Sequence, residues 1–290
     1  MRRKAAMHLL IIVMTTLVLF APSPAWHARI LNPEARNPAL LSILKLDVKS
    51  VGQFDREQLS EALSNVVLSP QANPADRLLA IRVLGQLKLD ETAETLGRLA
   101  LKNADALEKS MAVESAQALV RMNAHGALVA ALDSKNPGVR ALAARTGIGG
   151  QRLCALMTDQ WKIVRTAVAR GLGKEPRRDD CLVQALSDPE PNVLLAAAES
   201  AIGSQNPKLK KPLRAIAAKP SAYMPARQAA VIALAGMGDL EPARQILSSH
   251  LKRGGLIELA RASVRGLEQG NAPNEELRTA LSSKAFQVQL

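Results

Sequence analysis

The feature that most constrains the fold of this chain is an alanine-rich segment that recurs about every thirty residues. In its clearest copy, Asp188 can cap a helix, prolines suit the first turn, and Gly203 can end the helix. A period of this length is typical of stacked helical repeats, in which each unit buries its apolar face against its neighbours. The copies end 24 to 35 residues apart, at Gly85, Val120, Gly149, Gly173, Gly203, Ala235 and Glu268.

The composition of the chain favours helices over strands. Hydrophobic residues make up 48% of the 290 residues, whereas aromatic residues make up only 2%. Leucine and alanine must therefore fill the core, and both are good helix formers. Partner helices are expected between the repeated segments, for example at 180–186 and 242–247. We therefore predict an all-α chain, an α-solenoid in which helical hairpins stack as a right-handed superhelix.

Residues 1–25 have the layout of a secretory signal peptide. Three basic residues precede an apolar run from Met7 to Phe20, and small residues precede a cleavage site after Ala25. The sequence therefore predicts a periplasmic or secreted protein. The alternative is an uncleaved signal that anchors the chain in a membrane, although the apolar run is shorter than the ~20 residues that a membrane-spanning helix needs.

We divide the rest of the chain into two parts. Residues 26–54 contain two prolines and a short apolar run that fits either a helix or a strand, and we expect them to form an N-terminal arm or cap. Residues 55–290 are predicted to form the helical array. This array is expected to begin with a helix capped by Asp55 and to close with a helix at 274–281.

One motif indicates which kind of helical repeat is present. An aspartate follows a leucine-rich helix, and a Val-Arg pair opens the next helix. These residues resemble the HEAT-repeat family, in particular the short bacterial repeats also called phycobilisome-lyase-like repeats, over roughly residues 70 to 285. The motif occurs as Asp159 with Val164-Arg165, as Asp133 with Val139-Arg140, and as Asp188 with Val193-Leu194, where leucine replaces the arginine.

The resemblance implies a structural role for these charged residues. In the family, such aspartates and arginines form a polar ladder between neighbouring hairpins. We expect a break in the ladder at Leu194, filled by aliphatic packing. The expected ladder residues are Asp133, Arg140, Asp159, Arg165 and Asp188.

The two cysteines, Cys154 and Cys181, fall in corresponding partner helices of adjacent repeats. An exported protein can keep a disulfide. Neighbouring helices, however, are usually ~8 to 10 Å apart, which exceeds the usual Cα separation of a disulfide. The pair is therefore either a disulfide or two buried thiols. Two cysteines cannot supply four zinc ligands, so a structural zinc site is not expected.

Residue patterns that indicate catalysis are missing from the sequence. His8, His27, His125 and His250 lie outside metal-binding spacings such as HExxH, and no nucleophile or paired carboxylate accompanies them. The glycine-rich segment 147–150 lacks the lysine and hydroxyl residue of a phosphate-binding loop, and a helix end explains it better. We therefore predict no catalytic residue, no cofactor and no metal.

The formal net charge of +12 permits an anionic partner, and basic residues gather in one segment. A solvated face is one explanation, and a site for lipid headgroups or acidic envelope polymers is the other. Nucleic acid is disfavoured, because few aromatic residues are present to stack on bases and because export separates the chain from cytosolic nucleic acid. The segment contributes Lys208, Lys210, Lys211, Arg214 and Lys219.

The sequence thus predicts a non-catalytic, exported scaffold or adaptor that binds an unidentified protein partner on the curved surface of its second helices. An anionic-surface binding protein is the first alternative. A phycobilin-lyase-like enzyme is the second, since similar repeats occur in such lyases, but a shared fold does not carry an activity with it. The candidate surface residues are Arg145, Arg170, Glu199, Arg227 and Arg261.

Overall fold

The computed structural model describes residues 26–47, 49, 51–174, 179–253, 257–273 and 275. Within these ranges every regular element is a helix or a single 3-10 turn, so the predicted all-α solenoid class is confirmed. The predicted signal peptide at 1–25 lies outside the described residues. The same is true of the closing helix predicted at 274–281, apart from Glu275.

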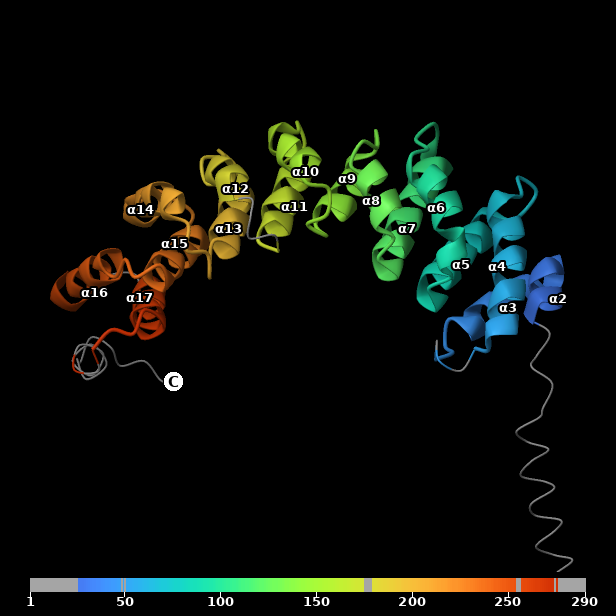
Figure 1. The fold of residues 1–290 in the computed structure, drawn as a ribbon, viewed down its shortest axis with the longest axis horizontal. Helices are drawn as coiled ribbons and strands as arrows, with labels where there is room; N and C mark the ends of the chain where they lie inside the picture. The colour runs from blue at the N-terminus through green and yellow to red at the C-terminus, as the bar shows by residue number, and fades with distance from the viewer. Residues whose placement is uncertain are drawn as a thin grey trace, which may run out of the picture. The chain divides into compact units, whose positions relative to one another are not determined.

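Helices alternate between the two arms of successive hairpins, and Figure 1 shows them following one another in chain order. The first helices of the hairpins are α2 (Trp26–Leu31), α4 (Gln53–Leu68), α6 (Ala93–Ala100), α8 (His125–Ala131), α10 (Gln151–Ala155), α12 (Asp179–Ala185), α14 (Lys210–Ala218) and α16 (Glu241–Arg253). The second helices are α3 (Pro33–Ile43), α5 (Pro74–Leu87), α7 (Ala106–Met122), α9 (Pro137–Ala144), α11 (Lys162–Leu172), α13 (Pro191–Ser200), α15 (Met224–Gly236) and α17 (Ile257–Gln269). The 3-10 turns are η2 (Asp90–Thr92), η3 (Leu156–Thr158) and η4 (Pro207–Leu209).

The described residues form two compact units, which are divided between Ala127 and Leu128. In the first unit, α2 packs on α3 and α4, α4 on α5, α5 on α7, and α6 on α7. In the second unit, the second helices pack in chain order from α9 through α11, α13 and α15 to α17. The sequence predicts a single array over 55–290, whereas the described residues of this range fall into two compact units.

Residues 26–54, expected to form an arm or cap, contain a complete helical hairpin. Asn32 caps the start of α3, because its Oδ1 accepts a hydrogen bond from the amide of Glu34. Pro33 occupies the first helical position, where a missing amide donor has no cost. The short apolar run that fitted either a helix or a strand is helical as far as Ile43. This hairpin buries its apolar residues against α4 and α5.

Three helices have boundaries that differ from those expected from the sequence. The N-cap residue of α13 is Glu190 and not Asp188, and this helix ends at Ser200, three residues before Gly203. Helix α4 begins at Gln53 with Gly52 as its N-cap residue, so Asp55 lies in the first turn and does not cap the helix. An acidic group there still favours the helix, because its charge opposes the helix dipole. Helix α9 ends at Ala144, because three glycines with positive φ follow it, and Gly149 is therefore part of a loop.

Small residues allow the second helices to approach each other closely. A Cβ atom on Gly171 of α11 would overlap the backbone of Ala144 at the end of α9. A Cβ atom on Gly85 of α5 would lie 2.7 Å from Cα of Ala118 in α7. Glycine and alanine are thus required where helix backbones come near each other, which explains why the repeated segments are alanine-rich.

Candidate functional site

The turns between the helices of a hairpin are held by arginines at one recurring position. Each of these arginines is the fourth residue of its second helix and donates to one or two backbone carbonyls in the last turn of the preceding first helix or in the turn that follows it. Arg140, for example, donates to the carbonyl oxygens of Ser134 and Lys135 at 2.7 and 3.2 Å. The arginines are Arg36 in α3, Arg77 in α5, Arg140 in α9, Arg165 in α11 and Arg227 in α15.

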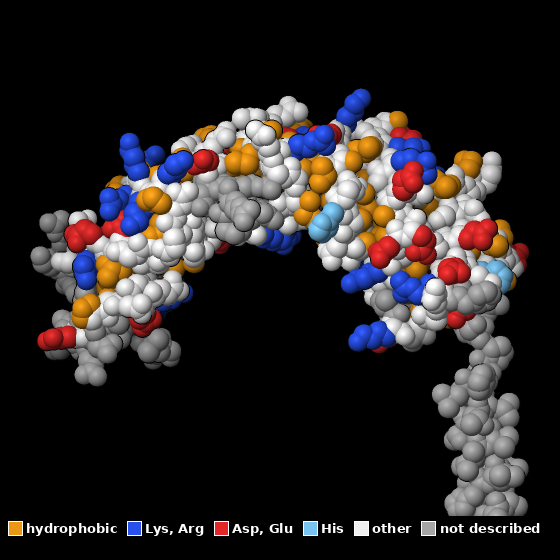
Figure 2. Space-filling view, viewed as in Figure 1, with side chains coloured by type: hydrophobic (Ala, Val, Ile, Leu, Met, Phe, Trp, Pro, Cys, Tyr) orange, Lys and Arg blue, Asp and Glu red, His pale blue; other side chains and the backbone are white. Residues whose placement is uncertain are grey.

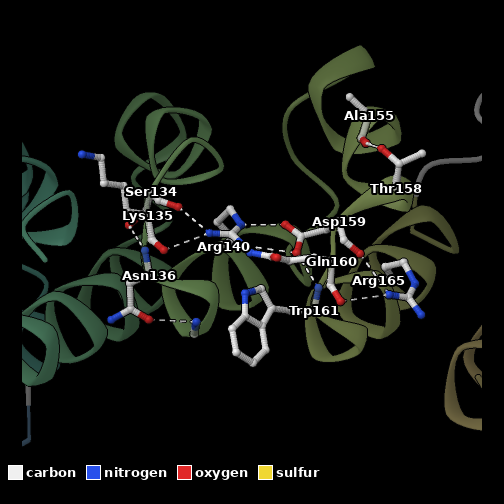
Figure 3. Close-up of polar contacts among 11 residues, drawn as sticks. Ser134, Lys135, Asn136, Arg140, Ala155, Thr158, Asp159, Gln160, Trp161 and Arg165 are labelled. Atoms are coloured by element: carbon white, nitrogen blue, oxygen red, sulfur yellow. Dashed lines mark hydrogen bonds and ion pairs between the residues drawn. The ribbon is translucent and has the colours of Figure 1, made fainter.

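Two of these arginines also form bidentate ion pairs with an aspartate of the next hairpin, and we call each such pair a rung. Nε of Arg140 lies 2.8 Å from Oδ2 of Asp159, and its Nη2 lies 3.1 Å from Oδ1 (Figure 3). Nε of Arg165 lies 2.7 Å from Oδ2 of Asp188. Both carboxylates are 6% exposed, and the hydrogen bond to Asp188 raises the pKa of Arg165 above its ordinary value.

The aspartate of each rung also shapes the turn in which it lies. Oδ1 of Asp159 accepts a hydrogen bond from the amide of Trp161 at 2.8 Å, and Oδ1 of Asp188 accepts one from the amide of Glu190 at 2.9 Å. Figure 3 shows the ring of Trp161 pointing away from the polar contacts of this turn. The arginine of one hairpin therefore fixes the start of the second helix in the next hairpin.

The rungs differ from the ladder expected from the sequence in two places. Asp133 is not paired with a rung arginine, and its exposed carboxylate lies 3.2 Å from Nη1 of Arg152. In the first unit, Asp76 lies 3.9 Å from Nη1 of Arg36 and accepts from Nδ2 of Asn37. The pairing of Asp76 with Arg36 was not predicted, although the spacing Pro-x-x-Arg at 33–36, 74–77 and 137–140 indicates the recurring arginine.

Arg227, expected to be a surface residue, is buried. Its Nε donates to the carbonyl oxygen of Ala217 at 3.1 Å, and desolvation lowers the pKa of Arg227 below its ordinary value. Arg227 thus holds the turn between α14 and α15. Among the described residues it has no aspartate partner, and it keeps only the carbonyl contact that all five arginines share.

The two cysteines join the first helices of adjacent hairpins. Cys154 in α10 and Cys181 in α12 form a disulfide with their Cα atoms 5.5 Å apart. This separation is shorter than the spacing of ~8 to 10 Å expected for packed helix axes. The cysteines lie on very short helices of five and seven residues, whose backbones can come closer than long packed helices do. The disulfide and the Arg165–Asp188 rung thus link the same pair of hairpins at different points.

A groove of about 560 Å³ opens on the second helices of the second unit, and we call it the α9–α11 groove. Equivalent positions of α9 and α11 contribute most of its lining, and small side chains form much of its floor. Ile163, one of the lining residues, is 57% exposed. The lining consists of Gly138, Ala141, Leu142 and Arg145 from α9 and its end, Lys162, Ile163, Thr166, Ala167 and Arg170 from α11, and Asn192 from α13.

The groove carries excess positive charge. Arg145 and Arg170, both expected to be surface residues, are exposed, and neither side chain forms a hydrogen bond or ion pair within the described part of the chain. Lys162 is partly neutralised by Glu190, whose Oε1 lies 3.3 Å from its Nζ. Lys174 donates to the carbonyl oxygen of Arg145 at 2.9 Å and adds a further cation at the end of α9.

The other two surface candidates lie elsewhere. Glu199 is exposed on α13 and is not part of the groove lining. Arg261 on α17 is partly exposed, and its Nη1 lies 2.9 Å from Oε1 of Glu258 one turn earlier. Neither residue therefore extends the groove.

The basic cluster expected from the sequence is partly neutralised. Nζ of Lys208 lies 2.8 Å from Oδ1 of Asp180, and Nε of Arg214 lies 2.6 Å from Oδ2 of Asp239. These hydrogen bonds raise the pKa of both basic groups. Figure 2 shows Lys and Arg side chains gathered where Figure 1 places α14. The cluster also includes Lys210, Lys211 and Lys219.

Within the described ranges, no group of three or more His, Cys, Asp or Glu side chains could hold a metal ion. Among the helices of these ranges, none combines the length and the apolar character that crossing a membrane requires.

Comparison with known proteins gives a family match for part of the second unit. Residues 150–235 match the family model of HEAT repeats, and this segment contains α11 and α13 with both cysteines. The chain is similar to the solved structure of Escherichia coli YibA, with 15% identity and a TM-score of 0.45 over 90% of this chain and 91% of that chain. It is also similar to human deoxyhypusine hydroxylase in complex with glycerol, with 14% identity and a TM-score of 0.30 over 85% of this chain and 95% of that chain. A search of curated protein sequences finds no match.

Proposed function

We propose that this chain is a helical-repeat scaffold that binds a protein partner in the α9–α11 groove. The observation that carries the proposal is the groove itself, a cavity of about 560 Å³ beside which Ile163 remains 57% exposed. Exposed apolar side chains that lie near one another mark interaction sites, and Trp161, two residues before Ile163, is also 50% exposed. The rungs support this role, because they hold the turns from which α9 and α11 start.

The chemistry of the groove suits binding better than catalysis. Its lining residues offer apolar groups, two guanidinium groups, one amine, one hydroxyl and one amide. Among these lining residues there is no carboxylate, histidine or cysteine that could act as a general base or activate Thr166. The groove therefore supports an adaptor rather than a phycobilin-lyase-like enzyme.

The proposal includes export to the periplasm or the extracellular space, with cleavage near Ala25. The disulfide between Cys154 and Cys181 supports it, because such bonds persist in oxidising compartments and are rare in the cytosol. The test is cell fractionation with N-terminal sequencing of the recovered protein. A mature chain beginning at Trp26 in the soluble envelope fraction is expected, whereas a full-length chain in the membrane fraction would favour an uncleaved anchor.

The binding proposal is tested by site-specific photocrosslinking in the native compartment. A photoreactive residue at Ile163 is expected to capture one specific protein, identified by mass spectrometry. The matched control carries the same residue at Gln151, which is exposed on the first helix α10. The proposal fails if both positions capture the same proteins or if position 163 captures none.

A second candidate function is binding to an anionic surface through α14. It is favoured by the exposed cations Lys211 on α14 and Lys219 at its C-cap. Figure 2 shows Lys and Arg side chains gathered in this part of the second unit. Sedimentation with vesicles that contain phosphatidylglycerol tests it. Binding that is lost when Lys211→Glu and Lys219→Glu are combined would support this function, and unchanged binding would exclude it.

A further inference from the structure

We infer that the occupant of the α9–α11 groove is a protein segment in which a carboxylate side chain lies about three residues from an apolar one. This inference rests on the proposed function and adds the chemistry of the partner. Two features of the groove carry it, its apolar edge at the start of α11 and its unpartnered cations at the ends of α9 and α11.

The apolar feature lies at the beginning of α11. Ile163 is 57% exposed, and Trp161, two residues earlier in the chain, is 50% exposed. Aromatic residues are only 2% of the chain, and this half-exposed tryptophan directly precedes Lys162, which lines the groove. Tryptophan and isoleucine gain most from burial when a partner covers them. The occupant therefore needs an apolar side chain at this end of the groove.

The cationic feature lies at the other end of the same helices. Arg145 follows the last residue of α9, and Arg170 lies in the last turn of α11. The helix dipole favours cations at both places, but it leaves the guanidinium donors free. Within the described residues neither side chain has an acceptor. A guanidinium presents a planar fork of donors that fits a carboxylate with two hydrogen bonds, so acidic side chains are the matching groups.

The distance between the two features sets the spacing of the partner. Ile163 and Arg170 are seven residues apart on one helix, which places them on the same face about 10 Å apart along its axis. A segment in the polyproline II conformation advances about 3.1 Å per residue with three residues per turn, so side chains three positions apart lie on one face of it and about 9 Å apart. Thr166 and Ala167 form the groove between them. A segment that lies along α11 in this conformation would thus place an acidic side chain three positions from its apolar anchor.

The shape of the site favours a peptide segment over a lipid surface. A bilayer presents a broad plane of phosphates, which an open cluster such as that on α14 can meet. The α9–α11 groove instead combines apolar floor residues such as Ala141 and Ala167 with a small number of separated cations, which is the pattern of a site that selects one ligand segment.

The experiment measures the binding of labelled peptides to the full chain by fluorescence anisotropy. The probe peptide has leucine with glutamate three positions away on either side. In the first control peptide lysine replaces glutamate, and in the second serine replaces leucine. The protein variants are Arg145→Glu with Arg170→Glu, and the milder pair Arg145→Gln with Arg170→Gln. The matched control is Lys211→Glu with Lys219→Glu, which makes the same change in net charge on α14.

We expect the probe peptide to bind the wild-type chain and to bind the Arg145→Glu, Arg170→Glu variant about tenfold more weakly, with the glutamine pair in between. The α14 variant and the wild type should bind it equally, and both control peptides should bind poorly. Unchanged circular dichroism would show that the variants fold. Equal binding of the lysine peptide, or no loss in the arginine variants, would overturn the inference.

Three outcomes separate this inference from the proposed function. If no peptide binds while position 163 still crosslinks to one protein, the acidic partner is wrong and the scaffold function stands. If neither peptide binding nor crosslinking is seen, both fail. If phosphatidylglycerol vesicles bind the wild type and lose binding in the Arg145→Glu, Arg170→Glu variant, while the probe peptide does not bind, the groove recognises lipid headgroups and the inference is overturned.

Discussion

At the step from α11 to α13, Arg165 forms a bidentate ion pair with Asp188 of the next hairpin. At the step from α13 to α15, the corresponding fourth residue of the second helix is Leu194, and among the described residues no rung joins these hairpins. The helices nevertheless pack at both steps, and α13 and α15 bury alanines such as Ala197 and Ala230 completely. Packing of the second helices therefore does not require a rung.

Two contributions, aliphatic burial and the rung, occur together at the α11–α13 step, whereas only the first is present among the described residues at the α13–α15 step. Aliphatic burial brings the second helices together, whereas the rung and its carbonyl contacts determine how each turn is held. Arg227 lies between these two cases, because it donates to the carbonyl oxygen of Ala217 but pairs with no aspartate among the described residues. We therefore expect the loss of a polar or covalent link at the α11–α13 step to cost more stability than a matched change at the α13–α15 step.

The largest effect is expected for Arg165→Leu. This change leaves the 6% exposed carboxylate of Asp188 without its cation, and it frees the carbonyl oxygens that Arg165 binds. Removing one partner of a buried ion pair costs about 3 to 5 kcal/mol. Urea unfolding followed by circular dichroism measures the loss. The matched variant Leu194→Arg should change stability by less than about 1 kcal/mol, and equal effects at the two positions would refute the comparison.

Loss of the disulfide is expected to have the next largest effect. The bond closes a loop across 27 residues, and the chain-entropy model assigns about 3 kcal/mol to a bridge of this kind. Replacing Cys154 and Cys181 with serine should lower the free energy of unfolding by about this amount. A reductant should destabilise the wild type and leave the double variant unaffected. Stability that does not change when mass spectrometry shows complete reduction would mean that the bond adds nothing at this step.

A smaller effect is expected where the second helices touch. Gly171→Ala in α11 places a methyl group against the backbone of Ala144, which should cost about 1 to 3 kcal/mol through overpacking. Gly236→Ala at the end of α15 meets nothing within 4 Å, and it should stabilise the protein by about 0.5 to 1 kcal/mol. Thermal unfolding of both variants checks the opposite signs. A destabilised Gly236→Ala variant would be inconsistent with the open space at that position.

The smallest effect is expected for pH, because the stability that Arg165 contributes should not change across the neutral and mildly alkaline range. The pKa of Arg165 is raised in the folded chain by its hydrogen bond to Asp188, so the stabilisation is complete below the unfolded pKa and is lost only in strongly alkaline solution. The difference in unfolding free energy between the wild type and Arg165→Leu should therefore stay constant between about pH 7 and 10. A difference that shrinks over this range would mean that another titrating group maintains the rung.

Much of the fold could be predicted from the sequence because the repeat period and the alanine-rich segments reflect the packing directly. The register of single helices could not. Gly149 was aligned with helix ends because it is a glycine in a repeated segment, but α9 stops at Ala144. Helix ends depend on backbone angles of the following residues, and a glycine shows only that a turn is permitted.

The candidate site was predictable only in part. Positions in or beside the equivalent helices indicated Arg145 and Arg170, but the same reasoning indicated Arg227, which is buried. The facing of a side chain depends on where its helix begins, and Arg227 lies in the first turn of α15, where the chain enters from α14. The groove itself depends on small side chains such as Gly138 and Ala141 leaving space between two helices, which a single sequence does not show.

The disulfide and the Arg165–Asp188 rung have a joint consequence for how a ligand would be received. They attach the α10–α11 hairpin to the α12–α13 hairpin at two separate points, one on the first helices and one at the turn before α13. Two such attachments oppose rocking of one hairpin on the other, which a single attachment would allow. A segment that docks along α11 would then meet a surface that is already ordered, and the entropy cost of association would fall mainly on the segment itself.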